Sequence, residues 1–144
     1  MGGPAPAGTA AGGWRVNRPA VSPCPCGGGP YAECCEPLLD GARQALTAEE
    51  LMRSRYTAYA RHDADHVFRT WHPRTRPDSP PVDPEVVWTG LRVIRVEAGG
   101  PEDDTGTVEF LARHTGPHGS GELHEVSRFA RRAGRWCYVD GDAG

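Results

Sequence analysis

The sequence predicts an α+β fold in which a helical hairpin is cupped by a curved antiparallel sheet of about four strands, preceded by a small cysteine knuckle. Three observations lead to this expectation. Four of the five cysteines lie within residues 24–35. Apolar residues of the segment 47–71 recur at helical spacing. From residue 86 onward, apolar and polar residues alternate as they do in half-buried strands.

Composition limits the class of protein. The chain has 144 residues and a formal net charge of −3, which suits one domain with a small appended module and gives no net attraction to nucleic acid. No apolar run approaches the ~20 residues that cross a bilayer, and the first residues lack the basic and apolar regions of a signal peptide. We therefore expect a cytoplasmic protein without a membrane or nucleic-acid partner. Residues 1–20, rich in Gly, Ala and Pro, are expected to form a disordered tail.

The cysteine cluster predicts a metal site. Cys24 and Cys26 form one pair, Cys34 and Cys35 form another, and a Gly-rich loop joins the two pairs. Such a loop can bring four thiolates to the corners of one tetrahedron, which is the closed coordination of a structural Zn²⁺. The sequence therefore predicts one structural zinc ion in a knuckle spanning residues 21–43. A redox-active thiol cluster and an iron–sulfur site are the alternatives.

Two helices are expected after the knuckle. Thr47 and Glu50 match a capping box, in which the Thr hydroxyl accepts from the amide three residues on and the Glu reaches back to the cap amide. The helix that follows is predicted to end near His62, and Asp63 is a natural N-cap for a second, shorter helix. His62 and His66 stand four apart, as in a two-His metal pair. A cap at Asp63 interrupts the helix between them and argues against a second metal site.

Four strands are expected in the second half of the chain, separated by turn signals rich in Gly and Pro. The predicted strands cover residues 86–97, 105–114, 121–131 and 135–140. Alternation places Glu125 and Ser127 on one face of the third strand. It likewise places Trp136, Tyr138 and Asp140 together on one face of the fourth.

The chain resembles a known family in several separate runs of sequence. The four cysteines resemble the SEC-C motif, and the remainder resembles the small bacterial YchJ family. The matching runs are residues 51–56, 63–65, 70–73, 88–91, 125–129 and 136–141. The resemblance implies a nuclear-transport-factor-2-like (NTF2-like) cone over residues 44–144, with a zinc-binding SEC-C knuckle in front. It implies no particular biochemical activity.

A cone of this kind leaves a pocket between the concave face of the sheet and the helices. The side chains expected to line it are Arg53, Arg55, Tyr56, Trp71, His72, Glu125, Ser127, Trp136 and Tyr138. His72, Glu125 and Asp140 are the candidates for acid–base catalysis, with an arginine stabilising a developing anion. The alternative is an internal salt bridge from Glu125 to Arg53 or Arg55. We favour the salt bridge because such pairs are common in protein structures.

These expectations lead to one functional hypothesis and two alternatives. We expect a non-catalytic zinc-containing binding or adaptor protein, whose cone pocket holds a small molecule or a peptide and whose knuckle can face a protein partner. The first alternative is a cone-fold enzyme that performs acid–base chemistry on a small substrate. The second is zinc handling or thiol redox sensing through the cysteines. Because four thiolates leave zinc no open position, recognition or catalysis is expected in the pocket.

Overall fold

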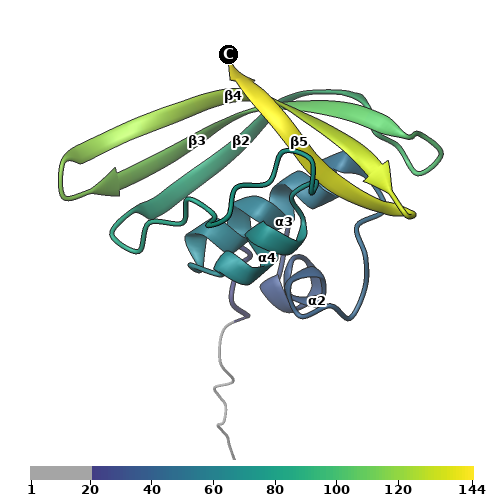
Figure 1. Cartoon of the computed structure of the whole chain (residues 1–144). Coiled ribbons are helices and arrows are strands. Elements are labelled where there is room, and N and C mark those ends of the chain that lie inside the picture. Colours follow the sequence, from purple (N-terminus) through teal and green to yellow (C-terminus); the bar gives the residue numbers. More distant parts are fainter. Residues whose placement is uncertain (1–20) are drawn as a thin grey trace, which may run out of the picture.

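The computed structural model describes residues 21–144, and the tail expected over residues 1–20 lies outside the described residues. A curved four-stranded antiparallel sheet lies over a helical layer, and the cysteine knuckle packs on the far side of that layer (Figure 1). The strand order β2-β3-β4-β5 follows the chain. The α+β arrangement predicted from the sequence is therefore confirmed.

The two helices of the hairpin begin where the capping residues predict. The helical elements in chain order are the 3₁₀ helix η1 (Tyr31–Glu33) and α2 (Glu36–Leu39), which belong to the knuckle, followed by α3 (Ala48–Ala60) and α4 (Ala64–Arg69), which form the hairpin. The hydroxyl of Thr47 accepts from the Glu50 amide at 3.0 Å, and Asp63 caps α4 by accepting from the His66 amide at 3.1 Å. Glu50 reaches back one residue further than predicted, since its Oε1 accepts from the Leu46 amide at 2.8 Å.

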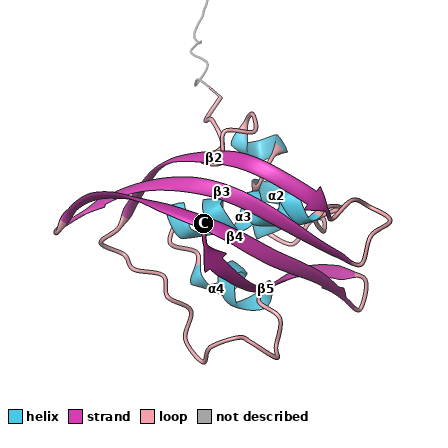
Figure 2. Cartoon of the chain, turned by 90° about the horizontal axis from the view of Figure 1, so that it is seen from above, coloured by secondary structure: helices cyan, strands magenta, loops and turns pink. Residues whose placement is uncertain are grey.

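The strands are long, and the sheet that they form is bent. In chain order they are β2 (Val87–Ala98), β3 (Thr105–Gly116), β4 (Gly119–Arg132) and β5 (Arg135–Ala143). The β2–β3 register shifts between Trp88 and Gly90 and again between Val93 and Arg95. A further shift occurs between β4 and β5 at Val139. Extra residues of this kind increase the local twist and bend the strand, which lets the sheet arch over the helices (Figure 2).

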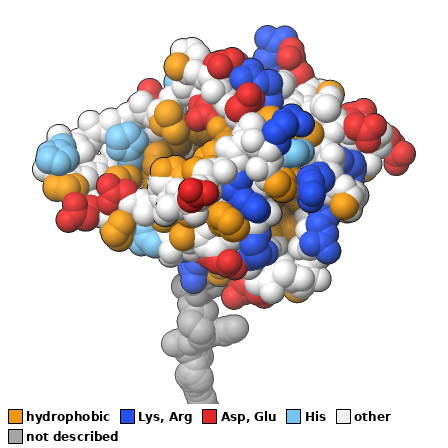
Figure 3. All heavy atoms as spheres, in the orientation of Figure 1, with side chains coloured by type: hydrophobic (Ala, Val, Ile, Leu, Met, Phe, Trp, Pro, Cys, Tyr) orange, Lys and Arg blue, Asp and Glu red, His pale blue; other side chains and the backbone are white. Residues whose placement is uncertain are grey.

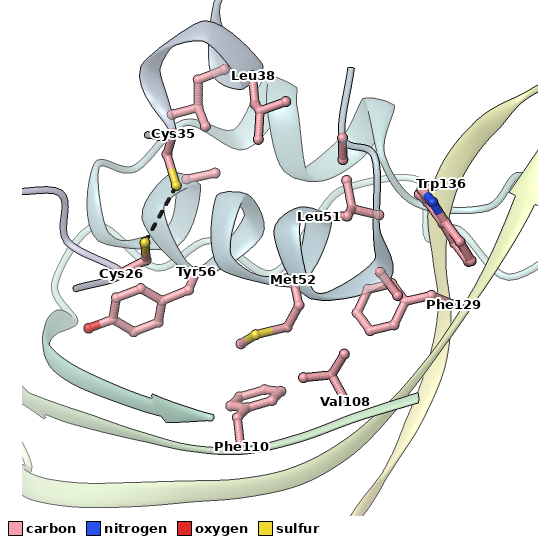
Figure 4. Close-up of a cluster of buried hydrophobic side chains, with 14 of the residues drawn as sticks. Cys26, Cys35, Leu38, Leu51, Met52, Tyr56, Val108, Phe110, Phe129 and Trp136 are labelled. Carbon is pink, nitrogen blue, oxygen red and sulfur yellow. Dashed lines mark hydrogen bonds between the residues drawn. The ribbon is translucent and has the colours of Figure 1, made fainter. Parts of the chain in front are cut away.

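One hydrophobic core joins the sheet, the helices and the knuckle. Met52 of α3 faces Val108 and Phe110 of the sheet, while Cys35 and Leu38 of the knuckle lie on the other side of the helix (Figure 4). All five side chains are buried. Because the two sets pack on opposite sides of α3, the knuckle and the sheet are stabilised by contacts with the same helix.

The start of α3 is held by the turn between β2 and β3. The Ala48 amide donates to the Gly99 carbonyl at 2.9 Å. Gly99 has a φ of +78°, and a Cβ atom there would lie 2.7 Å from the Cβ of Ala48. Glycine is therefore required at this position both by its backbone conformation and by the close approach of the helix.

The cap at Thr47 provides a test of how α3 begins. Replacing Thr47 with Ala removes the oxygen that accepts from the Glu50 amide, so we expect the free energy of unfolding to fall by about 1 kcal/mol. Urea denaturation of the two proteins measures the difference. Thr47→Ser retains the oxygen and is expected to keep most of the stability. An equal loss in both variants would show that the hydroxyl does not cap the helix.

Candidate metal centre and ligand cavity

Four sulfur atoms converge in the knuckle. The Sγ atoms of Cys24, Cys26, Cys34 and Cys35 all lie within 4.8 Å of one another. The Sγ of Cys26 lies 3.5 Å from that of Cys34 and 3.8 Å from that of Cys35. A tetrahedron with metal–sulfur bonds of about 2.3 Å has an edge of about 3.8 Å. The cluster can therefore hold a metal ion, and in residues 21–144 no other group of three or more His, Cys, Asp and Glu side chains is placed to do so.

A Gly-rich turn shapes the knuckle. The Cys24 amide donates to the Gly29 carbonyl at 2.7 Å, which closes the turn beneath the sulfurs. Gly27 and Gly29 have φ values of +83° and +126°, a region that residues with side chains rarely adopt. A Cβ atom on Gly28 would lie 3.0 Å from the sulfur of Cys34. The backbone thus passes directly against the cluster, and glycine makes this approach possible.

The four thiols cannot ionise independently. Hydrogen bonding with Cys35 is the largest of the effects on Cys26, and the pKa of Cys26 falls to about 5. Burial, followed by the contact with Cys26, raises the pKa of Cys34 to about 12. The contact with Cys26 and burial also raise the pKa of Cys35. One thiolate is therefore stabilised by its neighbours, whereas four adjacent thiolates require a bound cation.

Polar contacts seat the cluster on α3. Thr57 of α3 is fully buried, and its Oγ1 lies 3.6 Å from the sulfur of Cys24. Arg53, one helical turn earlier, donates from Nη1 to the carbonyl of Cys26 at 2.9 Å. The knuckle therefore contacts α3 in two ways, through the sulfur of Cys24 and through the backbone carbonyl of Cys26.

A cavity of about 270 Å³ lies between the concave face of the sheet and the α3–α4 hairpin. Most of its wall is apolar or aromatic, with contributions from Met52, Tyr56, Trp88, Phe110 and Phe129. On the face shown in Figure 3, hydrophobic side chains reach the surface between the sheet and the helical layer. Such a wall suits a small organic molecule rather than a chain of water molecules.

The guanidinium group of Arg55 is one of two charged groups that residues 21–144 contribute to the cavity wall, and Arg55 is only 6% exposed. Its Nη1 donates to the Val67 carbonyl at 2.9 Å and to the Thr70 hydroxyl at 2.8 Å. The guanidinium carbon lies 5.0 Å from the ring centre of Trp71 and 4.5 Å from that of Tyr138. Burial lowers the pKa of Arg55 from its usual value, but an arginine remains charged at neutral pH.

Glu125 of β4 is the other charged group in the wall. Its Oε2 accepts from the Ser127 hydroxyl at 2.7 Å and from the Tyr138 hydroxyl at 3.0 Å. Burial and then the charge of Glu125 raise the pKa of Tyr138, so that the phenol stays protonated and donates. Gly141 of β5 leaves the space that this carboxylate occupies, since a Cβ atom there would overlap Oε2.

Comparison with known proteins places the chain in a family. A sequence model described as "YchJ, middle NTF2-like domain" matches residues 47–141. The chain belongs to the YchJ family. A UPF0225 protein from Deinococcus radiodurans is 50% identical to it over 124 residues, covering 85% of this chain and 90% of that protein. A UPF0225 protein from Streptomyces coelicolor is 48% identical over 121 residues, covering 83% and 94%.

Two solved structures of SEC-C motif proteins resemble this YchJ-family chain. The solution structure of a protein from Rhodopseudomonas palustris is 38% identical, with a TM-score of 0.74, and covers 85% of this chain and 99% of that one. The crystal structure of a protein from Psychrobacter arcticus is 28% identical, with a TM-score of 0.70, and covers 86% and 84%. The combination of a SEC-C motif with an NTF2-like domain is therefore confirmed. No helix in the described part of the chain is long and apolar enough to cross a membrane.

The cavity of the YchJ-family chain contains some of the side chains expected there and lacks others. The expected residues that line it are Arg55, Tyr56, Trp71, Glu125, Ser127 and Tyr138. Arg53, His72 and Trp136 do not line it. Eight further residues line it that were not predicted for the pocket, among them Tyr59 and Trp88. Tyr59 could have been found, because it lies one helical turn after Arg55 on the same face of α3.

Neither arginine expected to pair with Glu125 does so. Arg53 forms an ion pair with Glu49, one turn earlier on α3, at 2.9 Å. Arg55 uses its Nη1 for a backbone carbonyl and a hydroxyl, and no ion pair formed within the described residues includes it. Residues 53 and 55 lie about 200° apart around the helix, so only one of them can face the sheet.

Trp136 and His72 lie outside the cavity for separate reasons. Trp136 is buried beside the start of α3, where its Nε1 donates to the Leu46 carbonyl at 3.1 Å. His72 follows α4, and its amide donates to the Tyr138 carbonyl at 2.8 Å. Its ring Nδ1 accepts from the Arg74 amide at 3.1 Å, which directs the ring toward the loop. His72 is therefore not an acid–base group of the cavity.

Asp140 lies on the outer face of the sheet, contrary to the prediction. Phe129 pairs with Tyr138, but the preceding residue of β4, Arg128, pairs with Asp140. Val139 is thus an extra residue in β5, and it reverses the alternation after Tyr138. The carboxylate of Asp140 accepts from the Nε of Arg128 at 2.5 Å on that outer face. Of the three candidate acid–base groups, only Glu125 faces the cavity.

His62 and His66 do not form a metal pair. His62 is exposed, and its Nε2 lies 3.1 Å from the Val86 carbonyl. His66 is buried, and its Nε2 lies 3.0 Å from the Ser54 hydroxyl, which itself donates to the Leu51 carbonyl. The proton of His66 is therefore on Nε2. Burial, as the largest cause, lowers the pKa of His66 to about 4 and keeps the ring neutral.

The burial of His66 predicts a loss of stability in acid. Its folded-state pKa of about 4 lies below the ordinary value of 6.5, so the unfolded chain binds the proton first as the pH falls. The stabilisation is complete above pH ~6.5 and is lost as the pH falls toward 4, by up to about 3 kcal/mol. Urea denaturation from pH 7 to pH 4 measures it.

Two variants separate His66 from other titrating groups. His66→Gln is expected to lose stability at neutral pH and to show a smaller further decline in acid than the wild type. His118→Gln changes an exposed ring and is expected to leave the pH profile unchanged. If His66→Gln loses as much stability between pH 7 and pH 4 as the wild type does, another group causes the acid sensitivity.

Proposed function

We propose that this chain is a zinc-containing, non-catalytic binding protein whose NTF2-like cavity holds a small molecule. The observation that carries the proposal is the four-sulfur cluster built into the core, on the other side of α3 from that cavity. The proposal divides the chain into a knuckle of residues 21–43 and a cone of residues 44–144. It also places the protein in the cytoplasm, where reducing conditions keep free thiols available to a metal.

The chemistry of the ligands supports zinc as the ion. Four soft sulfur atoms at tetrahedral spacing are typical of zinc and iron sites, and zinc has no redox chemistry that would disturb a structural role. Cys24, Cys26 and Cys35 are each at most 3% exposed, which restricts access to the ion. Four sulfur ligands also leave no open position for a substrate or a water molecule. The metal therefore stabilises the fold and does not take part in a reaction.

The cavity supports binding rather than catalysis. Acid–base chemistry needs at least one proton-transferring group within reach of the substrate, and usually a partner that sets its pKa. Glu125 faces the cavity but is held by two hydroxyl donors, while His72 and Asp140 lie elsewhere. A mostly aromatic wall with a few fixed polar groups is the composition of a small-molecule binding site.

Metal analysis tests the first part of the proposal. Protein purified under reducing conditions is expected to contain one zinc ion per chain, and a chelator is expected to lower its melting temperature. Cys34→Ser, at the least buried of the four cysteines, should lose most of the zinc. Cys137→Ser, at a cysteine outside the cluster, should keep it. Iron in place of zinc, or a stable protein without metal, would contradict the proposal.

A neutral probe tests the second part. We expect 2-phenylethanol to bind in the cavity of the wild-type protein, as measured by isothermal titration calorimetry. Ala112 is 1% exposed and lines the cavity, so Ala112→Leu fills part of the space and should weaken binding at least tenfold. Leu46→Ala, at an exposed position away from the cavity, is the control and should bind as the wild type does. Unchanged binding in Ala112→Leu would show that the probe sits elsewhere.

A further inference from the structure

Two opposite charges face the cavity without pairing with each other. Of the described residues, Arg55 and Glu125 are the only charged ones in its wall. No ion pair joins them, and none formed within residues 21–144 includes either side chain. Tyr138 contacts both groups, since its ring centre lies 4.5 Å from the guanidinium carbon and its hydroxyl donates to Oε2 of Glu125 at 3.0 Å. The two charges therefore share one space and one neighbouring side chain.

Each charge is anchored by contacts that leave part of it free. Arg55 donates only from Nη1 within the described residues, to Val67 and Thr70, so Nε and Nη2 remain available. In the same part of the chain, Glu125 accepts only at Oε2, from Ser127 and Tyr138, so Oε1 remains available. A guanidinium edge can bind a carboxylate through two parallel hydrogen bonds, and a carboxylate oxygen can accept from an ammonium or amide N–H.

The anchors also prevent the two groups from collapsing onto each other. The guanidinium is fixed between the rings of Trp71 and Tyr138 as well as by its hydrogen bonds. The carboxylate is fixed by two hydroxyl groups on neighbouring strands, in the space left by Gly141. Arg55 is buried and Glu125 is half-buried. A charge withdrawn from water in this way and incompletely paired is costly for the protein alone, and a ligand with the opposite charge compensates it.

We propose that the cavity binds a small amphoteric molecule of the amino-acid class, with its carboxylate on Arg55, its amino or amide N–H on Glu125 and an apolar body among the aromatic side chains. The proposal rests on the binding function proposed above. A purely anionic ligand is repelled by Glu125 and a purely cationic one by Arg55, so the pair discriminates against both.

The size of the cavity limits the ligand. At about 270 Å³, the cavity lies just below the range of about 300–1,000 Å³ that is usual for sites of drug-sized ligands. A space of this size suits a single amino acid rather than a peptide. Trp88, Phe110 and Phe129 supply the wall against which an aromatic or branched side chain would pack.

Four probes with the same phenyl group test the charge requirement. L-phenylalanine carries both charged groups, 3-phenylpropanoate only the carboxylate, 2-phenylethylamine only the ammonium, and 2-phenylethanol neither. Calorimetry at pH 7 is expected to show that L-phenylalanine binds at least about tenfold more tightly than each of the others, because each lacks a charge-assisted hydrogen bond. Equal affinity of L-phenylalanine and 2-phenylethanol would overturn the proposal.

A matched pair of variants tests whether the carboxylate of Glu125 binds the amino group of the ligand. Glu125→Gln retains the shape of the side chain but removes its charge, so L-phenylalanine should lose its advantage over 3-phenylpropanoate. Glu122→Gln changes an exposed carboxylate on the same strand and should preserve the advantage. Thermal unfolding of both variants checks that each is folded. An unchanged ratio of affinities in Glu125→Gln would show that this carboxylate does not bind the amino group.

The probes also separate the two proposals. If 2-phenylethanol binds and Ala112→Leu blocks it, but L-phenylalanine gains nothing, the cavity is a binding site without charge recognition. In that case the amphoteric ligand is wrong and the binding function stands. If none of the four probes binds to the wild-type protein, the binding function and the ligand class fail together.

Discussion

The contacts of α3 on two of its sides organise the whole structure. One side carries Thr57 and Arg53, which contact the cysteine knuckle, and another carries Arg55, which faces the cavity beneath the sheet. The helix can serve both because its residues advance by about 100° each, so that neighbouring positions point to different elements. The core is correspondingly continuous from the knuckle through α3 to the sheet. A metal bound in the knuckle would thus support the helix that forms one wall of the cavity.

Within the sheet, Tyr138 plays a part similar to that of α3, because it contacts several elements at once. Its backbone pairs with the end of α4, where its amide donates to the Thr70 carbonyl and its carbonyl accepts from the His72 amide, each at 2.8 Å. Its ring packs edge-on against Trp71 with 5.0 Å between the ring centres, and its hydroxyl holds Glu125. The same residue therefore links the sheet to the end of α4 and contacts both charged groups of the cavity. The bulge that follows it turns Asp140 away from that space.

Features of short range in the sequence were predictable. The spacing of the four cysteines, the caps at Thr47 and Asp63, and the alternation that places Glu125 and Ser127 on one face all depend on residues a few positions apart. The resemblance to the SEC-C motif and to the YchJ family also predicted the cone, and with it the cavity. Such patterns identify which side chains face inward, but they do not identify the atoms that those side chains contact.

The sequence by itself therefore determined the family, the cysteine cluster, the order of the elements and six of the residues that line the cavity, because each follows from local spacing or from a motif. Only the tertiary structure decided that Arg55 and Glu125 remain unpaired, that Arg53 serves the knuckle and that Asp140 lies outside. These outcomes depend on the rotation of α3 relative to the sheet and on one extra residue in β5. Neither is encoded in a local pattern, because both result from the packing of segments distant in the chain.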